Sequence, residues 1–147
     1  MASIRHRYTF IHNNNSESMM KFNIPIEIEP QLVADLITTA LEGGSNYWYL
    51  TRGSQSFKTE QTKHLTYWEA LAENLEKGYD FSVPIYDRED EHELLGKLSP
   101  ETIKAGLRLF AQDHTEEFVE WATSDNYDAD VADTAFQLMV LGEVVYG

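Results

Sequence analysis

The 147-residue sequence contains no cysteine, which excludes disulfide bonds, thiolate zinc sites and a cysteine nucleophile. It also has no apolar run near the ~20 residues that span a bilayer. Basic residues are few, with 11 Lys and Arg against 25 Asp and Glu, so the formal charge is −14. This charge disfavours binding to nucleic acid and to anionic membranes, because both attract basic surfaces. With 42% hydrophobic residues, the chain can bury a sizeable core.

The first 19 residues differ from the rest of the sequence. They contain Arg5 and Arg7 and only one acidic residue. They lack the apolar stretch of about 7–15 residues that marks a secretory signal. We expect residues 1–19 to form a loosely ordered extension. Residues 20–147 are expected to form a single domain, because neither a linker nor an internal repeat divides them.

Hydrophobic periodicity predicts strands in the first part of the chain and helices in the second. Alternating or aromatic runs predict strands at 22–29, 47–51, 57–59, 81–86 and, at the end, within 142–147. A repeat of about 3.6 residues predicts helices at 30–42, 66–77, 100–111, 115–122 and 129–141. This order indicates an α+β domain. We expect an antiparallel or mixed sheet of three to five strands, covered by three to five helices on one face.

Acidic residues concentrate near the end of the chain. After Arg108 come nine acidic and no basic residues, a charge of −9 over 39 residues. Some of these acids can stabilise helix starts or form a solvated helical face, because the positive end of a helix favours negative charge. The alternative is a surface that binds a basic partner, with an affinity that falls as salt rises. The candidate partner-binding acids are Asp125, Asp128, Asp130, Asp133 and Glu143.

Recognised catalytic and metal-binding motifs are missing. The aspartates at 125–133 lack the glycine and glutamate that an EF-hand loop needs at its sixth and twelfth positions. No two histidines have the i, i+4 spacing of a helical zinc motif, and no G-x-S-x-G or phosphate-binding glycine loop occurs. We therefore expect no catalytic residue, metal or cofactor. A looser carboxylate site for calcium or magnesium, and a small hydrolase built on such carboxylates, stay as alternatives.

The most distinctive stretch is EGGSNYWY at residues 42–49. Its two glycines permit a sharp turn or a close backbone approach, and Asn46 can hydrogen-bond its own backbone in such a turn. On a strand, Tyr47 and Tyr49 would share one face. Together with Arg52, which can bind a phosphate or carboxylate, these side chains suit a nucleotide-like ligand. A turn followed by core packing is the alternative interpretation.

Three segments resemble a group of small, mostly uncharacterised tailed-bacteriophage proteins. These proteins share a helix that ends in ALEGG, an NYW-type aromatic strand, an AD-x-x-x-Q helix and an FGEVVYG-like end. The matching residues here are 40–48, Ala132, Asp133 and Gln137, and 141–147, with Leu141 in place of the aromatic residue. The resemblance implies an accessory protein that acts in the cytoplasm of an infected bacterium and counters host defence.

These observations together predict a non-enzymatic binding protein. We expect it to form a homo-oligomer and to sequester either a host protein with a basic surface or a nucleotide-like signal. Besides the hydrolase, the alternative is a virion or assembly component.

Overall fold

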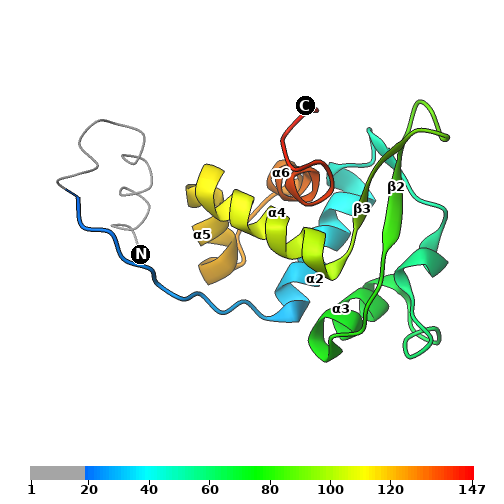
Figure 1. Cartoon of the computed structure of the whole chain (residues 1–147), viewed down its shortest axis with the longest axis horizontal. Coiled ribbons are helices and arrows are strands. Elements are labelled where there is room, and N and C mark those ends of the chain that lie inside the picture. The colour runs from blue at the N-terminus through cyan, green and yellow to red at the C-terminus, as the bar shows by residue number, and fades with distance from the viewer. Residues whose placement is uncertain (1–18) are drawn as a thin grey trace.

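The computed structural model describes residues 19–147, and helices make up most of this part (Figure 1). The α-helices are α2 (Pro30–Thr39), α3 (Tyr67–Lys77), α4 (Pro100–Asp113), α5 (Thr115–Ser124) and α6 (Ala129–Leu141). A π-helical turn, η2 (Ala40–Gly44), continues α2, and a 3-10 turn, η3 (Ser54–Phe57), precedes α3. The strands β1 (Tyr49–Leu50), β2 (Val83–Asp87) and β3 (Leu94–Leu98) form an antiparallel sheet in that order. The predicted α+β fold is confirmed.

Side-chain caps account for several helix boundaries that the sequence predicts. Thr66 and Ser99 each accept a hydrogen bond from a backbone N–H in the first turn of α3 and α4. Asp128 caps α6, where its Oδ1 accepts from the backbone N–H of Val131 at 2.9 Å. Gly78 ends α3 in the left-handed conformation, with φ 72°. These are short-range interactions, so the local sequence carries them.

The central helix of the fold is α6, which is buried on most sides. Figure 1 views it nearly along its axis, with α4 on one side and the region of α2 and η2 on the other. Gly106 of α4 lets the two helices approach closely, because a Cβ there would lie 2.4 Å from the Cα of Met139. Phe110, Trp121 and Phe136 are fully buried in the surrounding core. No helix in residues 19–147 is long and apolar enough to cross a membrane.

Strand β3 was not predicted from the sequence. Its LLGKL sequence lacks apolar–polar alternation, which is the signal that reveals a half-buried strand. Gly96 sits in its middle because α6 packs there: a Cβ would lie 2.3 Å from the backbone oxygen of Val140. The register between β2 and β3 also shifts between Ile85 and Tyr86. Pairing with β2 and packing against α6 therefore define this strand.

Three predicted strands are wrong. Phe57 is the last residue of the 3-10 turn η3, and residues 58–59 follow that turn. Residues 142–147 follow α6 and pair with no strand in the described part of the chain. Residues 22–29 are extended but pair with no strand in the described part of the chain, and Figure 1 shows this segment running along the outside. Phe22 and Ile24 are accordingly 60% and 44% exposed. Alternation indicates a strand only where a partner strand is present. The extension predicted for residues 1–19 lies outside the described residues, except for residue 19.

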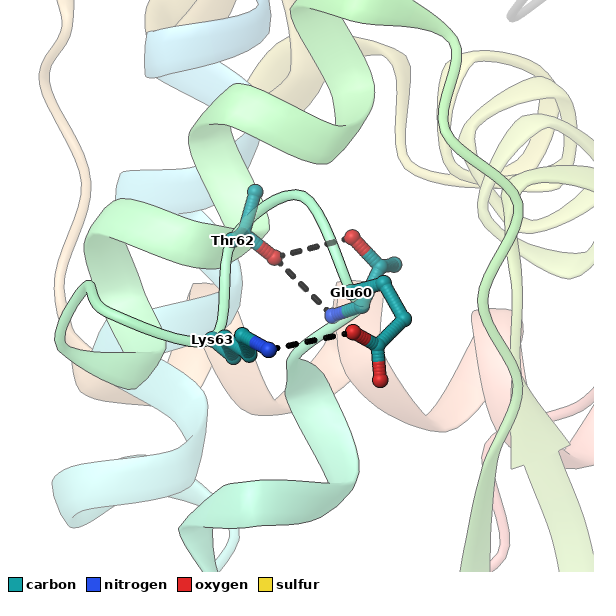
Figure 2. A network of polar contacts seen from close by, with 4 residues as sticks. Glu60, Thr62 and Lys63 are labelled. Atoms are coloured by element: carbon teal, nitrogen blue, oxygen red, sulfur yellow. Dashed lines mark hydrogen bonds and ion pairs between the residues drawn. The ribbon is translucent and has the colours of Figure 1, made fainter.

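A small polar network holds the loop between η3 and α3 (Figure 2). Thr62 is fully buried, and its Oγ1 accepts from the backbone N–H of Thr59 at 2.9 Å and donates to Oδ1 of Asn74 at 3.1 Å. On the solvent side, Lys63 Nζ lies 3.2 Å from Oε2 of Glu60. These contacts fix the connection between α3 and the part of the chain that contains the aromatic segment, residues 47–49.

Candidate functional site at Asp133

The side chain of Asp133, on α6, accepts hydrogen bonds from two parts of the chain, residues 45–48 and Gln137 of the same helix. Asp133 is 8% exposed. Its Oδ1 accepts from Ser45 Oγ at 2.7 Å and from Trp48 Nε1 at 2.8 Å. Its Oδ2 accepts from the Tyr47 hydroxyl at 2.7 Å and from Gln137 Nε2 at 3.0 Å. All four donors are uncharged hydroxyl, indole or amide groups.

Gly44 brings the donor residues close to α6. A Cβ at Gly44 would lie 2.3 Å from the backbone oxygen of Ala129, so a glycine is needed where η2 touches the first turn of α6. Ser45 follows directly and is fully buried against Asp133. The close approach expected from the glycine pair is thus confirmed at Gly44. At Gly43 a Cβ would meet no atom within 4 Å.

Gln137, one turn after Asp133, holds the C-terminal segment (residues 142–147). Its Oε1 accepts from the backbone N–H groups of Val145 and Tyr146 at 2.8 and 2.9 Å. Its Nε2 also donates to the backbone oxygen of Tyr146 at 3.1 Å. The ring of Tyr146 stacks on the Trp48 indole, with centroids 5.2 Å apart and planes at 11°. All three motifs of the phage resemblance therefore contribute residues to this one site.

Two tyrosines of the aromatic segment use their hydroxyls as internal donors. Desolvation, the hydrogen bond to Asp133 and the negative charge there raise the pKa of Tyr47 to about 12. Burial raises the pKa of Tyr49 to about 12, and its hydroxyl donates to the backbone oxygen of Leu41 at 2.6 Å. Both phenols are therefore protonated donors at neutral pH.

The four residues predicted to bind a nucleotide-like ligand do not lie on one element. Asn46 and Tyr47 are in a turn, Tyr49 begins β1, and Arg52 follows β1. Residues 46–48 form a turn and β1 begins at Tyr49, so the expectation that Tyr47 and Tyr49 share a strand face is wrong. Asn46 is exposed on that turn. The guanidinium carbon of Arg52 lies 4.4 Å from the ring centroid of Tyr86, on β2. Asn46 is exposed and Tyr47 is 48% exposed, whereas the hydroxyls of Tyr47 and Tyr49 donate to acceptors within the protein.

The predicted partner-binding acids also separate into distinct environments. Asp133 is buried, so it does not belong to the acidic surface. Asp125 is exposed after α5 in the left-handed conformation, with φ 50°. Asp128 and Asp130 occupy the start of α6 and are exposed, and Glu143 is exposed in the C-terminal segment. The helix-start role expected for Asp128 is confirmed by its cap.

A shallow groove of about 360 Å³ lies between α5 and the start of α6. Its lining residues are Glu116, Glu117, Glu120, Asn126, Tyr127, Asp128 and Val131. Among these residues, only Asp128 is a candidate partner-binding residue predicted from the sequence. The i, i+1, i+4 spacing of the three glutamates on a predicted helix was the available signal. In the described part of the chain, no group of three or more histidine, aspartate or glutamate side chains is arranged to hold a metal.

Gln137, Trp48 and Tyr146 were not predicted as functional residues, although they appear in the recognised motifs. Spacing in the sequence does not show that these residues belong to one site. Trp48, for example, lies 85 positions from Asp133, to which its indole donates. Comparisons with models of protein families, with curated protein sequences and with solved structures find no match to this chain.

Proposed function

We propose that this chain is a phage-encoded accessory protein that binds and blocks a basic host protein in the infected bacterium, without catalysis. The observation that carries the proposal is the groove between α5 and α6. Four of its lining residues are acidic, and they flank the partly buried Tyr127 and Val131. Such a groove suits lysine or arginine side chains, whose apolar stems pack on Tyr127 while their charged ends meet the carboxylates.

A protein partner is better supported than a nucleotide-like signal. The hydroxyls of Tyr47 and Tyr49 already donate to Asp133 and to a backbone oxygen, and Arg52 stacks on Tyr86. A nucleotide bound near Asn46 and Arg52 would have to replace these contacts. It would also approach a protein with a formal charge of −14.

The test compares two triple variants that remove equal charge. The groove variant carries Glu116→Gln, Glu117→Gln and Glu120→Gln. The control variant carries Glu89→Gln, Glu91→Gln and Glu93→Gln, in the exposed turn between β2 and β3. A host protein captured on the wild-type chain is purified, and its Kd is measured for each variant.

We expect the groove variant to lose at least about tenfold in affinity, or about 1.4 kcal/mol, and the control to lose much less. Binding to the wild type should weaken steeply with salt. Equal losses in both variants would indicate nonspecific charge attraction and contradict the proposal. The absence of any partner in the lysate would contradict it as well.

The alternatives are tested separately. A hydrolase that uses a divalent ion would show a higher Tm with magnesium, calcium or manganese, because a ligand of the native state stabilises it. A virion component would be detected by mass spectrometry of purified particles. Homo-oligomerisation, which we keep as part of the proposal, is measured by light scattering across protein concentrations.

A further inference from the structure

The contacts of the C-terminal segment have the character of peptide recognition. The Gln137 carboxamide pairs with two backbone N–H groups and one backbone oxygen, so it binds an extended main chain whatever the side chains are. The Trp48 ring adds a preference for an aromatic side chain, through its stack with Tyr146. Gln137 therefore binds the main chain of the segment, and Trp48 contacts its aromatic ring.

A third preference concerns the residue after the aromatic ring. Gly147 has φ 105°, a conformation that side chains rarely adopt. A Cβ at Gly147 would also lie 3.2 Å from the Tyr47 hydroxyl, which is fixed by its hydrogen bond to Asp133. The site therefore favours an aromatic residue followed by glycine.

We propose that Trp48, Gln137 and Tyr47 form a recognition site for an extended protein segment with an aromatic–glycine pair. The chain's own residues 144–147 occupy this site, and a partner segment of the same chemistry binds when they leave. The site is separate from the acidic groove between α5 and α6, so the proposal does not depend on that groove.

The resident segment is attached through few side chains, so a competing segment has few contacts to replace. Beyond its bonds to Gln137 and the ring stack, Val144 and Val145 remain 45% and 56% exposed. The segment pairs with no strand among residues 19–147, and it follows α6 through Gly142 at φ 76°. Segments with few buried apolar contacts open more readily than the core of a protein.

If the C-terminal segment left the site, Gln137 and Trp48 would lose their contacts with it. Gln137 is 1% exposed and Trp48 is 2% exposed with the segment in place. Departure of the segment removes three hydrogen bonds from the Gln137 carboxamide and uncovers one face of the indole. Unpaired polar groups and exposed aromatic surface are both unfavourable, so a matching segment supplied by another chain is stabilised there.

The experiment uses a chain that ends at Leu141 and a synthetic GEVVYG peptide with the sequence of residues 142–147. Calorimetry measures peptide binding to this shortened chain and to the full chain. We expect the shortened chain to bind and the full chain to bind at least about tenfold more weakly, because the resident segment competes at an effective concentration in the mM range. Two control peptides carry Tyr146→Ala or Gly147→Val, and each should bind about tenfold more weakly than the parent.

Circular dichroism establishes whether the shortened chain is folded. If it is folded and does not bind the peptide at about 1 mM, or binds the Tyr146→Ala peptide equally well, the proposal is overturned. If it does not fold, the full chain with Tyr146→Ala replaces it, because that variant keeps the backbone contacts and loses the ring stack. Stronger peptide binding to this variant than to the wild type supports the proposal, and equal or weaker binding overturns it.

Discussion

The Asp133 carboxylate accepts hydrogen bonds from Ser45, Tyr47 and Trp48, which are distant in the sequence. Hydrogen bonds to charged groups contribute about 1.5–3 kcal/mol each, and Asp133 accepts four of them in a buried position. In Asp133→Asn, an NH₂ group replaces one oxygen and faces donors. We expect the free energy of unfolding to fall by about 2–3 kcal/mol in urea titrations.

The matched control is Asp130→Asn, an exposed position in the same helix. Surface changes of this kind stay within about 0.5 kcal/mol. Equal stability of the two variants would mean that the four hydrogen bonds contribute little to the fold.

Alkaline pH should destabilise the fold through the tyrosines. The pKa values of Tyr47 and Tyr49 are raised from 10.0 to about 12, and burial together with a hydrogen bond to Glu42 raises the pKa of Tyr67. Between these pH values the unfolded chain loses phenolic protons that the folded chain keeps. The stabilisation is therefore fully present below pH 10 and is lost as pH rises through 12.

Urea midpoints measured at increasing pH check this expectation for the wild type and for Tyr47→Phe. The variant lacks one of the shifted phenols, so its stability should depend less steeply on pH. If stability falls with pH equally steeply in Tyr47→Phe and in the wild type, Tyr47 does not contribute to the pH dependence.

At the scale of elements, the contact between η2 and α6 depends on one glycine. Gly44→Ala places a methyl group 2.3 Å from the Ala129 oxygen, so the two elements must separate. We expect a loss of about 1–3 kcal/mol, together with weaker packing around Trp48 that near-UV circular dichroism detects. Gly43→Ala is the control, because its Cβ meets nothing within 4 Å. If both variants unfold at the same urea concentration, the close approach at Gly44 does not limit stability.

The sequence predicted those elements whose signals are local. Helices α3, α4 and α6 have a side-chain cap and an apolar repeat within their own residues. Strand β3 and the unpaired segment at 22–29 were misjudged because pairing, and not alternation, decides whether an extended chain becomes a strand.

The candidate site was predictable only in pieces. Tyr47 and Asp133 were both singled out, one for a ligand and the other for a basic partner. Their hydrogen bond spans 86 positions, and no local pattern encodes such a contact. In the sequence, nothing distinguishes Gln137 from other helical residues. Its hydrogen bonds with two backbone N–H groups of the C-terminal segment are known only from the structure.

At the scale of the whole molecule, acidic repulsion should weaken the fold at low salt. The formal charge is −14, and the ion pair of Lys63 with Glu60 lies on the exposed surface. We expect the free energy of unfolding to rise from low salt to about 1 M NaCl, where the screening length is about 3 Å.

The triple glutamine variant of the α5–α6 groove should show a smaller rise, because it carries three fewer charges. Urea titrations at both salt concentrations compare the two proteins. An equal rise in the free energy of unfolding of both proteins would show that the repulsion does not arise from the groove.

The long separation between Trp48 and Asp133 also has a consequence for synthesis on the ribosome. Trp48 is polymerised 85 residues before Asp133. At a synthesis rate of about 5–20 residues per second, about 4–17 s pass between the synthesis of Trp48 and that of Asp133. During that interval the aromatic segment of the nascent chain lacks the Asp133 carboxylate as its acceptor. The site can therefore form only after α6 has emerged from the ribosome.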